Sequence, residues 1–259
     1  MANLPPTISG PIIATLSEDS FVAWVSAVTN VYDPDTFVVR AENIPALPPG
    51  ITYDLTFSAF VIDSHDAAWQ FLGAGMVTQV ILSYTVTDGE FSVPHTLVVN
   101  MLGVNDEAVI GGTSAAFVGE DGVAVSELLT VSDADVGEAA FHPELEPLQG
   151  AYGSFTLTAA GRWTYTLTPG NAAVQALGAG ETLSESFVAV TLDGTEQVVT
   201  VTILGADEPT ITGTAAADVL IGTAASEMMF GLGGNDNLQC NYVNDTLDSG
   251  TGADSLYGG

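Results

Sequence analysis

Residues 209–259 carry an acidic side chain at every ninth position, and this period constrains the fold more than any other feature of the chain. An apolar residue follows each acid two positions later, giving the pairs Asp218 with Leu220, Glu227 with Met229, Asp236 with Leu238, Asp245 with Leu247, and Asp254 with Leu256. A nine-residue repeat with one aliphatic and one acidic side chain is typical of a parallel β-roll, whose short strands stack the aliphatic side chains. The acids then lie in the loops, where they can bind calcium.

A longer repeat divides the rest of the chain. The segment 103–111, Gly-Val-Asn-Asp-Glu-Ala-Val-Ile-Gly, returns as 205–213, Gly-Ala-Asp-Glu-Pro-Thr-Ile-Thr-Gly, so that Asp106 and Asp207 are 101 residues apart. An acidic pair before the start of an apolar strand is typical of a junction between tandem domains, and about 100 residues is the size of a β-sandwich. We therefore expect three domains, with the boundaries 1–104, 105–208 and 209–259.

Alternating side chains predict that the first two domains are built from strands. Trp163, Tyr165 and Leu167 point to one side of a strand, and the intervening threonines point to the other. Residues 80–86 show the same alternation, and short runs of this kind are separated by turn-rich pieces. The prediction is an all-β fold, with tandem antiparallel β-sandwiches followed by a short parallel β-roll.

The charge balance restricts the partners of the chain. Asp and Glu number 32 against two Lys and Arg, for a formal net charge of −30. Such a surface repels nucleic acid and anionic lipid, so neither is an expected partner. Because 47% of the residues are hydrophobic, the chain can still form a core. Carboxylates without basic neighbours either stay solvated on an acidic surface, an alternative that remains open, or gather around a hard cation, Ca²⁺ before Mg²⁺.

Several other kinds of site are disfavoured. The chain has one cysteine, Cys240, so it can form no internal disulfide and lacks the Cys and His sets expected for zinc. Polar residues interrupt the uncharged stretch between Asp66 and Asp88, so we expect no membrane insertion. The segment 63–66, Asp-Ser-His-Asp, contains the residue types of a hydrolase triad, but neighbours on one loop cannot generally align for catalysis. We expect no enzymatic activity.

Acids recur at matching positions in the two sandwiches. Glu120-Asp121 and Asp133-x-Asp135 of the second correspond to Glu18-Asp19 and Asp33-x-Asp35 of the first. Loops cluster at the poles of a sandwich, where six to eight oxygens at about 2.3–2.6 Å would satisfy Ca²⁺ and relieve the repulsion between carboxylates. The alternative, that these acids only stabilise turns, stays open. The predicted calcium ligands outside the roll are Asp106, Glu107, Glu120, Asp121, Asp133, Asp135 and Asp207.

Three family resemblances follow from these motifs. The order Asn105-Asp106-Glu107, Glu120-Asp121-Gly122, Ser132-Asp133-Ala134-Asp135 and Arg162-Trp163-Thr164-Tyr165 resembles a VCBS repeat of large bacterial surface proteins, over residues 104–208. Residues 1–103 resemble a diverged cadherin-like relative. The ladder is similar to the RTX, or hemolysin-type, calcium-binding nonapeptide Gly-Gly-x-Gly-x-Asp-x-apolar-x, best preserved at 231–238 and 249–256.

The RTX resemblance implies calcium ions held between turns that lie two apart in the roll. It pairs Asp236 with Asp254 and Asp218 with Asp236, whereas the turn of Asp245 lacks the usual glycines. Glycines supply the left-handed backbone that lets carbonyl groups turn toward the ion. The ligands that the resemblance implies in the roll are Asp218, Gly231, Gly233, Asn235, Asp236, Asp245, Gly250, Gly252 and Asp254.

Together the resemblances imply a calcium-dependent protein outside the bacterial cell or on its surface, exported by type 1 secretion. The pattern stops within a repeat at Gly259, so we expect neighbouring repeats and a secretion signal in a longer chain. The leading hypothesis is a structural and adhesive segment of an adhesin or biofilm protein, with a cell-surface glycan or protein as ligand. An alternative is the noncatalytic carrier region of a secreted RTX enzyme or toxin. A second alternative is a glycan- or peptide-binding module in residues 1–104 that uses Trp69 and Phe71, although aromatic side chains in such a segment more often belong to the core.

Overall fold

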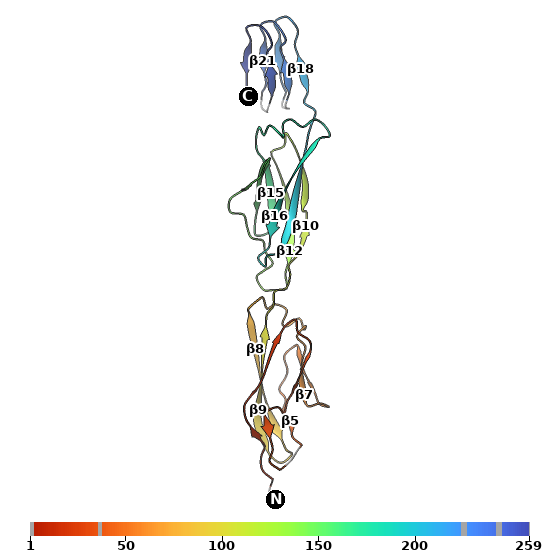
Figure 1. Cartoon of the computed structure of the whole chain (residues 1–259), viewed down its shortest axis with the longest axis vertical. Coiled ribbons are helices and arrows are strands. Elements are labelled where there is room, and N and C mark those ends of the chain that lie inside the picture. Colours follow the sequence, from red (N-terminus) through yellow and green to blue (C-terminus); the bar gives the residue numbers. More distant parts are fainter. Residues whose placement is uncertain (1–2, 36–37, 224–226, 242–244, 259) are drawn as a thin grey trace. The chain divides into compact units, whose positions relative to one another are not determined.

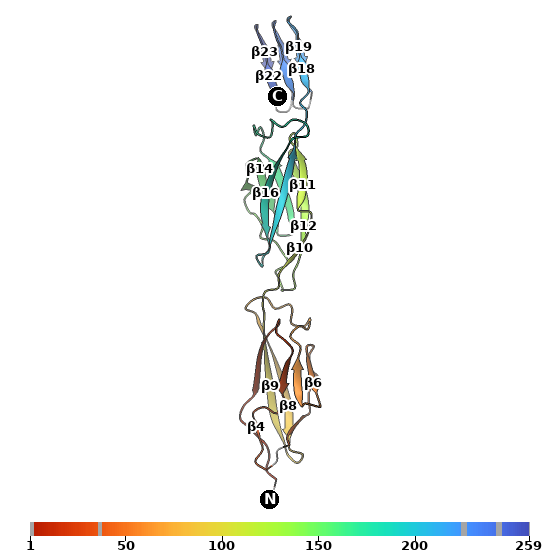
Figure 2. The same cartoon turned by 45° about the vertical axis from the view of Figure 1, so that its right-hand side comes forward.

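The computed structural model describes residues 3–35, 38–223, 227–241 and 245–258. These residues form strands, turns and loops without a helix, which confirms the predicted all-β fold (Figures 1 and 2). In the described part of the chain, no helical segment has the length and hydropathy needed to cross a membrane. The chain divides into two compact units, Met1–Val109 with Ser132–Ala139, and Ile110–Val131 with Ala140–Gly259.

The first unit contains a sandwich of two sheets, with the strand orders β2-β9-β8-β5 and β3-β7-β6. Strands β8 and β9 form a long antiparallel hairpin, while β2 runs parallel to β9 with Ile12 opposite Leu97. A separate antiparallel pair joins β1 to β4. The strands are β1 (Thr7–Ile8), β2 (Ile12–Ser17), β3 (Ala23–Ser26), β4 (Val31–Tyr32), β5 (Arg40–Glu42), β6 (Ile51–Asp54), β7 (Ala59–Ile62), β8 (Val77–Thr87) and β9 (Ser92–Leu102).

Alternation along the strands builds the core of this sandwich. Leu97, Val99 and Met101 of β9 are buried together with Phe60 and Ile62 of β7, while the residues between them face outward or lie at intermediate depth. A period of two separates the two faces of a strand, so one face of each sheet supplies the core.

Residues 63–76 form consecutive turns that carry Trp69 into this core. The Trp69 side chain is 5% exposed, and its indole Nε1 donates to the Asp63 carbonyl oxygen at 3.1 Å. The ring fills the space beside Gly50, where a Cβ would overlap the indole. Farther along the turns, the Phe71 carbonyl oxygen accepts a hydrogen bond from the Val136 backbone N–H at 3.1 Å. This bond holds the loop after β12 (Ala124–Ser132) within the first unit.

The second unit contains another sandwich, with the strand orders β10-β12-β15-β14-β13 and β11-β17-β16. Trp163, Tyr165 and Leu167 of β15 are buried, as their alternation predicts. As in the first sandwich, one pair is parallel, here β11 with β17. The strands are β10 (Val109–Gly112), β11 (Ala115–Gly119), β12 (Ala124–Ser132), β13 (Leu148–Gln149), β14 (Gly153–Leu157), β15 (Arg162–Leu167), β16 (Thr182–Val190) and β17 (Glu196–Leu204).

The nine-residue ladder forms two small parallel sheets, β18-β20-β22 and β19-β21-β23. Paired strands belong to alternate turns of the roll, so Leu220 lies opposite Leu238, and Leu238 opposite Leu256. Met229 and Leu238 are fully buried between the sheets. The parallel β-roll is therefore present as predicted. Its strands are β18 (Thr210–Thr212), β19 (Val219–Ile221), β20 (Met228–Phe230), β21 (Asn237–Gln239), β22 (Thr246–Asp248) and β23 (Ser255–Tyr257).

Candidate calcium sites

Four acidic residues gather at one pole of the first unit, which we call the acidic pole: Glu18, Asp106, Asp133 and Asp135. Glu18 follows β2, Asp106 follows β9, and the Asp-x-Asp pair follows β12. Glu18 Oε1 accepts from the Val104 backbone N–H at 2.7 Å, and Asp135 Oδ2 accepts from the Asp106 N–H at 2.9 Å. Asp133 Oδ1 accepts from the Asp135 N–H at 2.8 Å. One oxygen of each of three carboxylates is thus fixed by backbone.

The remaining oxygens of these carboxylates are buried without a hydrogen bond. Glu18 Oε2, Asp106 Oδ2, Asp133 Oδ2 and Asp135 Oδ1 have no hydrogen-bond partner among the described residues. Burial raises the pKa of Glu18 and of Asp106, and the charges of neighbouring acids, including Asp19, raise both further. The Val104 N–H opposes this shift at Glu18. Buried carboxylates that repel one another and lack partners are an unfavourable arrangement without a cation.

The acidic pole fits a hard cation that completes its coordination from other oxygens. No three Asp, Glu, His or Cys side chains of the described residues form by themselves a group that could hold a metal ion. Calcium takes six to eight oxygens and accepts backbone carbonyls and water among them. An open hollow of about 410 Å³ lies beside the carboxylates and is lined by Asp106, Asp133 and the exposed Glu107. The four buried, unpartnered oxygens therefore suit an ion that is also reached by water.

Glu120 does not join the acidic pole, although the sequence pattern groups it with Asp106, Asp133 and Asp135. It belongs to the second unit, where it follows β11 as Glu18 follows β2. Each Glu lies near the junction that ends its own sandwich, and Glu18 takes the position at the acidic pole. The match between Glu18-Asp19 and Glu120-Asp121 in the sequence indicates that the two glutamates are equivalent. That Glu18 lies beside Asp106 follows only from the parallel pairing of β2 with β9.

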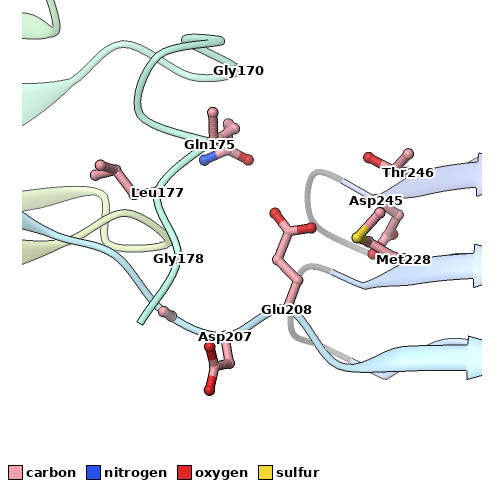
Figure 3. A pocket seen from close by; sticks show the side chains of 11 residues that line it. Gly170, Gln175, Leu177, Gly178, Asp207, Glu208, Met228, Asp245 and Thr246 are labelled. Atoms are coloured by element: carbon pink, nitrogen blue, oxygen red, sulfur yellow. The ribbon is translucent and has the colours of Figure 1, made fainter. Parts of the chain in front are cut away.

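Glu120 is the centre of a second acidic set. Its Oε1 accepts from the Ala206 backbone N–H, and its Oε2 is buried with no hydrogen-bond partner among the described residues. Burial raises the pKa of Glu120; the Ala206 N–H opposes this shift, and the charges of Asp121 and Glu208 add to it. Asp207 Oδ1 accepts from the Ala179 N–H at 3.3 Å. Figure 3 shows the carboxylates of Asp207 and Glu208 directed to opposite sides of the chain, so Glu208 and Asp207 do not converge on one point.

In the roll, acids that lie two turns apart are joined by backbone hydrogen bonds. The Asp218 N–H donates to Asp236 Oδ1, the Glu227 N–H to Asp245 Oδ1, and the Asp236 N–H to Asp254 Oδ1, each at 2.9 Å. The pairs that the resemblance implies are therefore adjacent in space. The Glu227–Asp245 pair has the same geometry, although its sequence departs from the nonapeptide.

Small spaces beside glycines bring carboxylate and carbonyl oxygens together in the roll. A Cβ on Gly231 would lie 2.7 Å from Asp236 Oδ2 and 2.6 Å from the Ser249 carbonyl oxygen. A Cβ on Gly213 would lie 2.9 Å from both Asp218 Oδ2 and the Gly231 carbonyl oxygen. Asp236 Oδ2 is buried without a hydrogen-bond partner among the described residues. The space beside Gly231, bordered by this oxygen and by a carbonyl oxygen, therefore suits a cation. Beside Gly213, Asp218 Oδ2 already accepts from the Thr214 backbone N–H at 2.6 Å.

The other predicted glycines shape the loops that flank these spaces. Gly250 and Gly252 have φ of 77° and 145°, and a Cβ on either would overlap the carbonyl oxygen of Leu232 or of Gly234, respectively. Gly233 forms a parallel bridge with Thr251. Asn235 Oδ1 accepts from the Ala253 N–H at 3.0 Å, so this side chain fixes the neighbouring turn.

The Glu227–Asp245 pair shares its second contact with Asp218, because Asp218 Oδ2 also accepts from the backbone N–H of the threonine four residues earlier, Thr214, at 2.6 Å. Glu227 Oε1 accepts from the Thr223 backbone N–H at 2.8 Å, and hydrogen bonds from Thr223 lower the pKa of Glu227. Burial raises the pKa of Asp245. Residues 224–226 and 242–244, which belong to these two turns, lie outside the described residues.

The serine of the triad-like segment is structural. Ser64 is fully buried, and its hydroxyl donates to the Ser20 carbonyl oxygen. A buried hydroxyl committed to a carbonyl has no path to a substrate, and neighbouring His65 is exposed. The aromatic binding hypothesis also needs correction at Trp69, because that ring is in the core and presents no face to a ligand.

The fold is that of a modular all-β protein, and its acidic residues gather in sets at the ends of strands. Residues 105–205, within the segment that resembles a VCBS repeat, match a bacterial cadherin-like domain. Residues 210–238 and 241–259 match the RTX calcium-binding nonapeptide repeat. The predicted resemblance to cadherin-like and RTX proteins is confirmed, and both matches support a calcium-binding bacterial surface or secreted protein.

Solved structures with a similar fold include cadherin domains. Protocadherin Gamma B2 extracellular cadherin domains 1–5 match with a TM-score of 0.47 and 15% identity, over 86% of this chain and 44% of that one. Human Protocadherin-24 EC1-2 Form II matches with a TM-score of 0.43 and 15% identity, over 80% of this chain and 100% of that one. This chain thus spans less than half of the first of these structures. None of the curated proteins matches it in sequence.

Proposed function

We propose that the chain is a noncatalytic, calcium-stabilised structural and adhesive segment of a large bacterial surface protein that is exported by type 1 secretion. The acidic pole is the observation that carries the proposal: four carboxylates each keep one buried oxygen without a hydrogen bond among the described residues. Calcium at this pole would tie the loop Ser132–Ala139 to the end of the first sandwich, which already holds it through the bond between Phe71 and Val136. Neighbouring repeats of the same kind would extend the segment.

Calcium dependence would also keep the chain unfolded inside the cell before export and allow it to fold outside after export. Sites of about 10⁻⁴ to 10⁻³ M affinity stay empty where calcium is scarce and fill at extracellular, millimolar concentrations. The roll depends most on such filling, because its buried apolar core is small. Export of an unfolded chain followed by folding outside the cell is consistent with this dependence.

The test is a calcium count on the whole chain, combined with melting curves. Isothermal titration calorimetry gives the number of ions, and thermal unfolding followed by circular dichroism is compared in millimolar Ca²⁺, in the same concentration of Mg²⁺, and in chelator. We expect several bound Ca²⁺ ions, a higher melting temperature, and more β-structure in Ca²⁺ than in Mg²⁺ or chelator. Identical melting in all three solutions, with no heat of binding, would overturn the proposal.

A further inference from the structure

An exposed aromatic pair lies on the outward face of the β3-β7-β6 sheet. Trp24 of β3 is 55% exposed, and Phe57, in the turn between β6 and β7, is 69% exposed. Their ring centroids are 5.6 Å apart and their planes meet at 88°. The two rings, with Ser26 and Ala59, line an open hollow of about 390 Å³. We call this hollow the Trp24–Phe57 site.

The strand register explains why these side chains share one face. Trp24 lies opposite Val61 and Ser26 lies opposite Ala59, whereas the alternate residue Phe60 points into the core. Ala59 is only 5% exposed although it belongs to the outward set. Its small side chain therefore lies at the base of the hollow, and the two rings rise beside it.

Hydrogen bonds fix the turn that carries Phe57. Asp54 Oδ1 accepts from the Thr56 N–H at 2.7 Å and from the Phe57 N–H at 3.1 Å. Asp54 also lies opposite Ala59 in the register of β6 and β7, so its carboxylate is on the same face as the hollow. The backbone of the turn that carries the Phe57 ring is thus fixed, and a negative charge lies on the same face.

The charge of the chain decides which kind of ligand suits this site. The net charge is −30, so an anionic ligand or a second copy of the chain would be repelled. Neither arginine belongs to the sheet that carries the rings, since Arg40 is in β5 and Arg162 is in β15. Aromatic faces attract cations through their quadrupoles, with Trp the strongest. The negative net charge of the chain and the two aromatic rings therefore both favour a positively charged ligand.

The residues that line the hollow offer few polar groups, and this favours an organic cation over a metal ion or a sugar. A metal ion such as Ca²⁺ needs several oxygen ligands, and a sugar needs several directed hydrogen bonds. Among the four lining residues, only the Ser26 hydroxyl and the Trp24 indole N–H can form side-chain hydrogen bonds. An alkylated ammonium group needs none. We infer that the Trp24–Phe57 site binds a quaternary or methylated ammonium group, independently of the calcium sites.

The test uses tetramethylammonium as the probe and the uncharged isostere 3,3-dimethylbutan-1-ol, compared with choline, as the matched control. The whole chain is titrated in saturating Ca²⁺ at constant ionic strength, and the indole N–H signals of the three tryptophans are followed by NMR. Trp69 Nε1 and Trp163 Nε1 donate to backbone carbonyls, so they serve as internal references. We expect saturable shifts at Trp24 alone, with choline binding at least about fivefold more tightly than its neutral isostere.

Two variants keep the Trp24 signal and separate the contributions. Phe57→Leu preserves apolar bulk but removes one ring, and we expect an affinity about fivefold lower for tetramethylammonium. Asp54→Asn keeps an acceptor for the turn and removes the charge, so it should weaken binding less and mainly at low salt. The control Phe117→Leu changes a ring that is 68% exposed on the second sandwich and should leave affinity unchanged.

Any one of the following results would overturn the inference. The first is equal binding of choline and its neutral isostere, which would make the hollow a nonspecific apolar patch. The second is a linear shift that never saturates, or an unchanged affinity in Phe57→Leu. The third is a saturable shift of Trp24 with neutral monosaccharides and none with tetramethylammonium, which would identify a sugar site instead.

Discussion

The carboxylate of Glu18 accepts a hydrogen bond from the backbone N–H of Val104 at 2.7 Å, and the two residues are 86 positions apart in the sequence. Glu120 and Ala206, also 86 positions apart, form the corresponding bond in the second sandwich. In each sandwich a glutamate after the first strand of a parallel pair thus fixes the start of the junction after the last strand. The second oxygen of each glutamate is buried without a hydrogen-bond partner among the described residues.

Replacement of either glutamate by glutamine separates its role as a hydrogen-bond acceptor from its role as a negative charge. Glu18→Gln keeps an oxygen for the Val104 N–H but removes the charge, and Glu120→Gln does the same for Ala206. We expect each variant to lose about 0.4–1.4 kcal/mol of the stabilisation that calcium gives, which is what a site of about 10⁻³ to 10⁻⁴ M affinity contributes in about 1 mM Ca²⁺. In chelator the same variants should be as stable as the parent or more stable, because a buried charge is gone. Chemical denaturation in Ca²⁺ and in chelator measures both effects.

The exposed Glu146 provides the matched control for these variants. Glu146→Gln removes one negative charge without touching either junction, and it should leave the calcium-dependent stabilisation unchanged. If the control lost as much as Glu18→Gln, the calcium effect would be screening of the net charge rather than binding at defined carboxylates.

The pH dependence of stability should change sign with calcium. Burial is the main cause that raises the pKa of Glu18, Asp106 and Glu120 above the ordinary 4.5, 3.8 and 4.5. Without calcium, the folded chain therefore binds more protons than the unfolded chain at pH values between those ordinary values and the raised ones. The free energy of unfolding should rise as the pH falls from neutral toward these ordinary values. Asp88 and Glu227, whose pKa is lowered, act in the opposite direction mainly below this range.

In calcium, protons compete with the ion for the same oxygens, so the stability should fall over the same range. Denaturant titrations at several pH values, with Ca²⁺ and with chelator, give the slope of the free energy of unfolding against pH in each solution. Parallel slopes in the two solutions would contradict a calcium site made of these carboxylates.

Trp69 should be essential for folding of the first sandwich and unimportant for ligand recognition. Trp69→Ala removes a buried ring and its bond to the Asp63 carbonyl, and we expect a loss of about 3–5 kcal/mol. Gly50→Ala should be destabilising too, since its Cβ overlaps the indole and φ at this position is 78°. Phe71→Ala, at a ring that is 43% exposed, should cost far less. Thermal melting ranks the three variants by stability. Similar losses of stability in Trp69→Ala and Phe71→Ala would contradict the packing of the Trp69 ring in the core.

The periodic parts of the structure could be predicted from the sequence, and the parts set by topology could not. A fixed period of nine dictates that Leu220, Leu238 and Leu256 stack on alternate turns, because each turn repeats the last. The grouping of Glu18 rather than Glu120 with Asp106 depends on which strands are neighbours, and local patterns do not encode that. The burial of an aromatic ring in a turn-rich loop is likewise a tertiary property, so the sequence leaves both a core position and a ligand-binding role open for Trp69.

Leu232 tests the backbone requirement of the roll, because it occupies a position where its counterpart two turns later is Gly250. Both residues have positive φ, 69° for Leu232 and 77° for Gly250. A left-handed conformation costs a non-glycine residue about 1–2 kcal/mol, and glycine loses about 0.5–1 kcal/mol through its greater freedom in the unfolded chain. The Leu232 side chain is half exposed, so little burial is lost on its removal. Leu232→Gly should therefore leave the stability unchanged or raise it by up to about 1 kcal/mol.

The reverse change at Gly250 should have the opposite and larger effect. A Cβ at Gly250 would overlap the Leu232 carbonyl oxygen, so Gly250→Ala combines backbone strain with a clash between turns. We expect a loss of about 1–3 kcal/mol and a weaker response of the roll to calcium, because the carbonyl must move. Hydrogen exchange of the amides in β20 to β23, in Ca²⁺, reports on the roll separately from the sandwiches. Equal protection in Leu232→Gly and Gly250→Ala would show that left-handed backbone at this position does not limit the stability of the roll.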